Sequence, residues 1–127
     1  MKKYLLLSIL AAVILGLLAG GCNAVRTYND PWKTINVQTG EEFIIALDSN
    51  PTTGYEWAAT YDEGMLILME SSYKTGKEAR KGAVGAGGTQ YFHFKANKSG
   101  KTEITLVYKR SWEDGSAEQK VFSVDID

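Results

Sequence analysis

A period-two alternation of apolar and polar residues from residue 33 onward is the strongest constraint on the fold. Ile35 and Val37 alternate with polar neighbours, and Phe92, Phe94 and Ala96 do the same further along. Such alternation places one row of side chains inward and the other in water, as in a half-buried β-strand. The predicted strands are residues 33–39, 41–48, 55–60, 65–73, 89–96, 102–110 and 120–126. The fourth also has helical propensity, but its neighbours favour a strand.

Turn signals separate these strands at residues 39–40, 50–51, 62–64, 99–100 and 114–115. Seven short strands at this spacing predict an all-β fold, an antiparallel β-sandwich. In such a sandwich the loops between strands two and three, four and five, and six and seven emerge at one end. Three irregular segments therefore share that end: residues 50–55, 74–89 and 110–112.

The first of these segments is Asn50-Pro51-Thr52-Thr53-Gly54-Tyr55. Pro51 fixes its own φ at about −65° and keeps Asn50 extended, and Gly54 permits a positive φ. Between these stiff ends the small, uncharged Thr52 and Thr53 are expected to point outward. A stiffened loop loses less entropy when it docks, so the segment suits a binding loop. The alternative is a decorated hairpin turn, because Asn, Pro and Gly dominate turns generally.

The second and third segments have different chemistry. Gly85-Ala86-Gly87-Gly88 ends a long glycine-rich connection, and its bare backbone permits another chain to approach closely. A floppy linker is the alternative. Arg110-Ser111-Trp112 follows a strand, and Arg and Trp are the residues most enriched at binding hot spots. The alternative for Trp112 is a ring folded back over the sandwich end and stacked on Arg110.

The N-terminal residues have the pattern of an export signal. Lys2 and Lys3 precede an apolar run at 5–18, and small residues then lead to Cys22, the only cysteine. Residues 18–22 resemble a bacterial lipobox, which implies a lipid on Cys22 and an exported protein anchored to the cell envelope membrane. A retained anchor helix is the alternative, since the run is nearly long enough to span a bilayer. We expect a signal peptide at 1–21, a tether at 22–32 and one domain at 33–127.

Charge and motif content exclude several functions. Without Lys2 and Lys3, 12 basic residues face 15 acidic ones with no basic face, so nucleic acid is not an expected partner. His93 is the only histidine, and the alternation points it away from the core. With Cys22 in the lipobox no Cys–His pair exists, and no cluster has metal-ligand spacing. We expect no enzyme, no metal and no cofactor.

Three motifs in order resemble those of the chagasin-type inhibitors of papain-like cysteine peptidases. They are Asn50–Tyr55 followed by Trp57, Gly85–Gly88 before an aromatic strand, and Tyr108-Lys109-Arg110-Ser111-Trp112. The resemblance covers residues 34–126. One departure is Ser111, where the family usually has proline, and the third loop should be less rigid for it.

The resemblance implies an immunoglobulin-like sandwich whose three loops fill the peptidase cleft. Thr52 and Thr53 would cover the catalytic Cys and His of the enzyme, and Gly85–Gly88 would make backbone hydrogen bonds along one side. Trp112 would pack on the opposite wall, with Arg110 in polar contact. Inhibition would be reversible and non-covalent, by a monomer. Two alternatives are a module that binds glycan or another envelope protein through Trp112 and Tyr55, and a purely structural lipoprotein.

Overall fold

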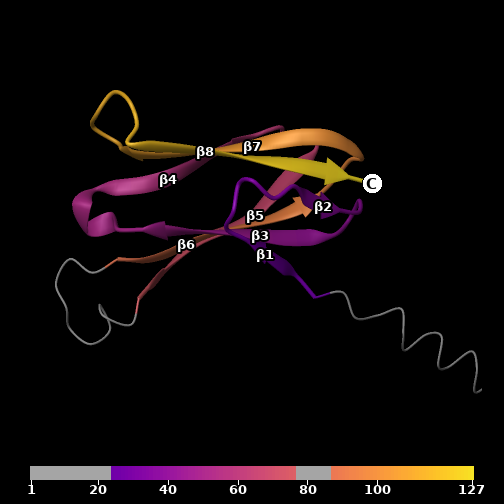
Figure 1. Ribbon diagram of the computed structural model, residues 1–127, viewed down its shortest axis with the longest axis horizontal. Coiled ribbons are helices and arrows are strands. Elements are labelled where there is room, and N and C mark those ends of the chain that lie inside the picture. The colour runs from indigo at the N-terminus through magenta and orange to yellow at the C-terminus, as the bar shows by residue number, and fades with distance from the viewer. Residues whose placement is uncertain (1–23, 77–86) are drawn as a thin grey trace, which may run out of the picture.

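Two four-stranded β-sheets pack face to face in the computed structural model, which describes residues 24–76 and 87–127 (Figure 1). The first sheet has the order β1 (Arg26–Tyr28), β3 (Glu42–Ser49), β6 (Gly88–Ala96) and β5 (Leu66–Thr75). The second has the order β2 (Ile35–Val37), β8 (Glu118–Ile126), β7 (Gly100–Arg110) and β4 (Tyr55–Tyr61). A short 3₁₀-helix, η1 (Pro51–Thr53), connects β3 to β4.

The core is built from the inward rows of the alternating strands. On β3, Phe43, Ile45 and Leu47 are buried, and Phe43 stacks on Phe94 of β6 with ring centroids 5.6 Å apart. The second sheet contributes the buried residues Ile104, Leu106, Phe122, Val124 and Ile126. Each of the seven predicted strands is present, and residues 66–75 form a strand rather than a helix. The alternation predicted the strands because a strand that is buried on one face has an apolar residue at every second position.

The prediction of a wholly antiparallel sandwich is wrong at two edge strands. β1 pairs in parallel with β3, and β2 pairs in parallel with β8. Residues 26–28, predicted to belong to the tether, form β1, and the Tyr28 ring packs edge-on against Phe43 at 6.4 Å. Arg26 and Thr27 are exposed and only Tyr28 is partly buried, so this strand has no alternating apolar row that the sequence could reveal.

Within the described residues, the ends of the strands that flank the three predicted segments can be located in the sandwich. The β3–β4 connection, the facing ends of β5 and β6, and the β7–β8 connection all lie at the left end in Figure 1. We call this the η1 end. Within residues 24–76 and 87–127, no helix is long and apolar enough to cross a membrane.

Candidate functional site

The segment from Asn50 to Tyr55 is a locked turn at the η1 end. Asn50 is extended, with φ −133° and ψ 85°, and Gly54 has a φ of +83°, as Pro51 and Gly54 predicted. The carbonyl of Asn50 accepts the Thr53 N–H at 3.2 Å, and that of Pro51 accepts the Gly54 N–H at 2.9 Å. The Thr53 hydroxyl also donates to the Asn50 carbonyl, at 2.6 Å, and the Thr52 hydroxyl donates to Asn50 Oδ1. Thr52 and Thr53 remain exposed at the tip.

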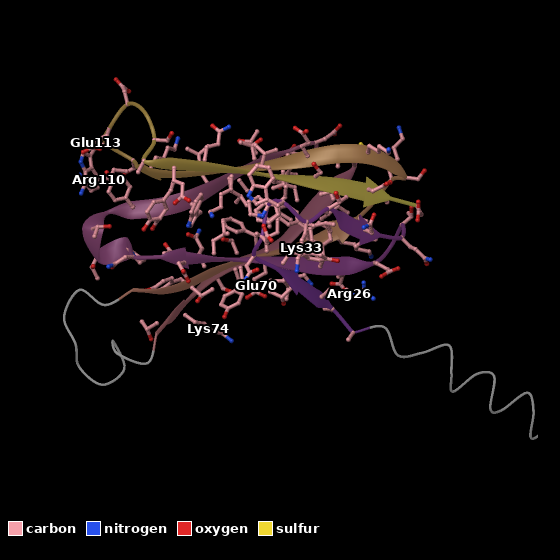
Figure 2. All side chains as sticks on the ribbon, viewed as in Figure 1. Arg26, Lys33, Glu70, Lys74, Arg110 and Glu113 are labelled. Atoms are coloured by element: carbon pink, nitrogen blue, oxygen red, sulfur yellow. The ribbon has the colours of Figure 1, made fainter. Side chains whose placement is uncertain are left out.

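Arg110, the last residue of β7, ties the third segment to the first. Its Nε donates to the Thr53 carbonyl at 3.0 Å, and its Nη1 bonds to Glu113 Oε1 at 3.0 Å (Figure 2). The guanidinium also lies 4.3 Å from the centre of the Tyr55 ring, within range of a cation–π interaction. The resemblance implied polar contacts between Arg110 and a peptidase, but some of the Arg110 donors are used inside this protein.

Trp112 has features of both alternatives that the sequence left open, an exposed binding residue and a ring folded back over the end of the sandwich. Its side chain is 68% exposed, which suits a binding residue. The edge of its ring nevertheless rests on Gly54, because a Cβ atom added there would lie 2.2 Å from Trp112 Cη2. Stacking on Arg110 is looser, with the guanidinium 5.9 Å from the ring centre. Ser111 is exposed in the turn between them.

The glycine segment reaches the same end of the sandwich. Gly85 and Ala86 lie outside the described residues. The Gly87 carbonyl accepts the Gly76 N–H at 3.0 Å, and a Cβ on Gly87 would lie 2.8 Å from the Ser49 carbonyl oxygen. A Cβ on Gly88 would lie 2.0 Å from the Lys74 carbonyl oxygen. Glycine is thus required at 87 and 88 because a side chain there would collide with neighbouring backbone of this protein. This requirement holds whether or not a partner is bound.

We therefore expect Gly88→Ala to destabilise the fold by about 1–3 kcal/mol, the usual cost of overpacking a close-packed interior. Gly88 pairs with Ser49 on one side and Thr75 on the other, so both neighbouring strands resist movement. Urea unfolding measures the change. Gly64→Ala is the control, because its Cβ would meet only the end of the Asp62 side chain, at 3.2 Å. Equal stability of the two variants would contradict the close approach at Gly88.

A stack of rings supports the turn from below. The Tyr55 and Tyr108 rings lie 5.2 Å apart, and the Tyr108 and Trp57 rings 4.8 Å apart. The Tyr108 hydroxyl accepts the backbone N–H of Asn50 at 2.9 Å, which anchors the base of the turn to β7. Tyr108 lies within the strand predicted at residues 102–110, but nothing in the alternation indicated this bond.

We expect Tyr108→Phe to preserve the stack and remove the hydrogen bond between the Asn50 N–H and the Tyr108 hydroxyl, at a cost of about 1 kcal/mol of stability. The base of the turn should be loosened, because this bond anchors it to β7. The matched control is Tyr61→Phe, since the Tyr61 ring packs on Phe94 and its hydroxyl bonds to no described residue. Thermal unfolding of both variants tests this, and equal stability of the two would refute a supporting role for the hydroxyl.

Gln90 is a second supporting residue, and its role was not predicted from the sequence. From β6 it bonds across to the other sheet, accepting the Trp57 N–H at 3.0 Å and donating to the Trp57 carbonyl at 3.0 Å. The Trp57 indole donates to the Asp48 carbonyl at 2.8 Å. The two Gln90 bonds satisfy the backbone N–H and carbonyl of Trp57 on β4, which is at the edge of its sheet. The signal was available: Gln90 is a polar residue in the same row as Phe92 and Phe94.

The titratable groups supply little chemistry. His93 is half-buried on the outer face of its sheet, with Nε2 3.2 Å from Glu42 Oε1, as expected for a half-covered strand histidine. In residues 24–76 and 87–127 no three His, Cys, Asp or Glu side chains gather where they could hold a metal ion. Cys22 lies outside the described residues. What the η1 end offers is a stiff, shaped surface.

Comparisons with known proteins agree with this geometry. Residues 36–126 match the family model described as Chagasin family peptidase inhibitor I42. The chain is 33% identical over 93 residues to Amoebiasin-1 of Entamoeba histolytica, covering 73% of this chain and 87% of that protein. It is also 33% identical over 99 residues to Chagasin of Trypanosoma cruzi, covering 72% of this chain and 84% of that protein.

A solved structure extends the similarity to three dimensions. The crystal structure of the cysteine protease inhibitor EhICP2 from Entamoeba histolytica aligns with a TM-score of 0.68 at 25% identity. The alignment covers 84% of this chain and 100% of that chain. The described sandwich is therefore similar to the whole of that molecule.

Proposed function

Because the chain belongs to the chagasin family of peptidase inhibitors, we propose that it inhibits papain-like cysteine peptidases by filling their active-site cleft with its η1 end. The family resemblance predicted from the sequence is confirmed, and the protein is an inhibitor rather than an enzyme. The family match favours this interpretation over the glycan-binding and purely structural alternatives. The proposed contact residues are the three predicted segments, 50–55, 85–88 and 110–112.

The observation that carries the proposal is the joining of the first and third segments into one stiff surface. Arg110 bonds to the Thr53 carbonyl, and the Trp112 ring rests on Gly54. Both contacts exist before a partner arrives, so little conformational entropy remains to be lost on docking. Exposed Thr52, Thr53 and Trp112 then offer two small side chains beside one large ring.

The same contacts explain how the turn would resist cleavage. A cysteine peptidase cuts only where its thiolate can reach a peptide carbonyl. The carbonyls of Asn50 and Pro51 accept hydrogen bonds within the turn, and that of Thr53 accepts one from Arg110. A turn whose carbonyls are held internally blocks the cleft without presenting a bond for attack. We therefore propose reversible, non-covalent inhibition.

Titration of residues 23–127 against papain and a cathepsin-L-like enzyme, with a small fluorogenic substrate, tests the proposal. This fragment contains every described strand. We expect inhibition at a one-to-one ratio that is reversed by dilution, with the inhibitor recovered intact. A folded domain that leaves both enzymes fully active would refute it, as would cleavage between residues 50 and 55. Gel filtration of the fragment tests the expected monomer.

We also propose that the protein is exported and anchored to the cell envelope membrane by a lipid on Cys22. Support comes from the lipobox-like residues 18–22 and from the absence of a second cysteine in the sequence. Removal of residues 1–21 would leave a mature chain of residues 22–127. Mass spectrometry of the membrane fraction of a bacterial host should find a lipidated Cys22 at the mature N-terminus. A Cys22→Ser variant should lose the lipid, and an uncleaved chain in the wild type would favour the retained anchor helix.

A further inference from the structure

One edge of the sandwich carries an unusually exposed tryptophan. This edge consists of β1, β2 and the connection at 29–34, since both strands are at the outer edge of their sheets. Trp32 in the connection is 94% exposed. A turn holds it there, because Asp30 Oδ1 accepts the Trp32 N–H at 3.0 Å and the Asp30 carbonyl accepts the Lys33 N–H at 3.2 Å. The ring is thus presented to the surroundings by an ordered segment.

The position of β1 brings this edge close to the proposed lipid anchor. The tether predicted from the sequence spans residues 22–32, but β1 begins at Arg26. Only four peptide units therefore separate Cys22 from the first residue of the sandwich, which is at most about 14 Å of extended chain. A domain held this close to its lipid cannot stand clear of the bilayer surface, and the edge that contains β1 is the one held nearest.

The side chains on this edge have the chemistry of a membrane interface. Tryptophan is enriched at the level of the lipid headgroups, where its apolar ring and polar N–H are both accommodated. Arg26 and Lys33 are exposed nearby, and neither forms an ion pair with a described residue. Val25, 44% exposed, precedes β1. Asp30 is the acidic residue of the connection, and its carboxylate accepts a hydrogen bond from the backbone N–H of Trp32.

We propose that Val25, Arg26, Trp32 and Lys33 form a membrane-contact edge that rests in the headgroup region of the bilayer. The inference builds on the proposed anchor at Cys22. In Figure 2, Arg26 lies toward the end where the chain enters β1, whereas Arg110 and Glu113 lie at the η1 end. The inhibitor would therefore lie along the membrane with its η1 end free at the side, oriented for a peptidase at the same surface.

The single cysteine allows a test that does not depend on cellular lipidation. Residues 22–127 are coupled through Cys22 to a maleimide-headgroup lipid in phosphatidylcholine vesicles, with and without brominated acyl chains. Brominated lipid quenches the emission of tryptophans that enter the bilayer. We compare the wild type with Trp32→Phe and Trp112→Phe; Trp57, 5% exposed, is a buried internal reference.

We expect quenching in the wild type and in Trp112→Phe, and loss of quenching in Trp32→Phe. Quenching that persists in Trp32→Phe, that disappears only in Trp112→Phe, or that is absent from the wild type would each overturn the proposal. Papain inhibition by the uncoupled chains is measured in parallel and should be the same for Trp32→Phe as for the wild type. Failure of the membrane contact is thereby distinguished from failure of inhibition, and mass spectrometry of the cellular protein reports on lipidation separately.

Discussion

Thr53→Trp is expected to abolish inhibition of papain while the domain remains folded. Thr53 is exposed at the tip of the turn, and its carbonyl is held by Arg110. At the centre of the proposed contact, a large ring would hold the two proteins apart and prevent Trp112 and the glycine segment from docking together. We expect the inhibition constant to rise at least about a thousandfold, equal to about 4 kcal/mol of binding free energy. Progress curves with a fluorogenic substrate measure it.

Thr60→Trp is the matched control for this change. Thr60 is exposed on β4, five residues beyond the start of that strand, where the chain has left the η1 end. The same added bulk there should leave inhibition within a factor of about two. Thermal unfolding of both variants confirms that each is folded. If the Thr53 variant still inhibited as the wild type does, residues 50–55 would not lie in the contact.

Gly54→Ala should weaken inhibition by about a hundredfold, or about 2.8 kcal/mol, for two separate reasons. An L-residue at a φ of +83° costs roughly 1–2 kcal/mol. In addition, the new methyl group would collide with the Trp112 ring, whose Cη2 atom would lie 2.2 Å away. One substitution thus strains the first segment and displaces the third. Inhibition constants and urea unfolding measure the two consequences.

Two further variants separate these causes. Gly40→Ala carries the same backbone strain, with a φ of +91°, but a Cβ there meets nothing within 4 Å, and it lies between β2 and β3. It should lose about 1–2 kcal/mol of stability and keep its inhibition. Gly54→Ala in a Trp112→Ala background should cost less than in the wild type because the collision is gone. Strictly additive effects of the two changes would show that Trp112 does not rest on Gly54.

The strands and the conformation of the first segment could be predicted from the amino-acid sequence. Alternation marks a strand where one face packs on the core and the other meets water, as in residues 42–49 and 88–96. The turn at Asn50–Tyr55 was equally predictable, because Pro51 and Gly54 restrict φ through their own covalent structure. The motifs at 50–55 and 108–112 also indicated the family, since each is a short run of consecutive residues.

The contacts that hold the segments together could not be predicted from the sequence, because they join residues far apart in the chain. Arg110 meets Thr53 and Tyr108 meets Asn50 across 57 and 58 residues of sequence. Both contacts follow from the register that pairs Tyr55 with Arg110 and Trp57 with Tyr108. Register is set by the packing of whole strands, and a shift of one residue would turn each of these side chains to the other face. No local pattern carries that information.

The need for glycine at 88 and the formation of β1 also depend on contacts between segments that are distant in sequence. The need for glycine at 88 arises from the Lys74 carbonyl on a neighbouring strand, and the strand at 26–28 forms because β3 offers it an edge. Backbone preferences act within a few residues and can be inferred from sequence. Close approach and edge pairing depend on which strands become neighbours, and that is decided only when the two sheets pack.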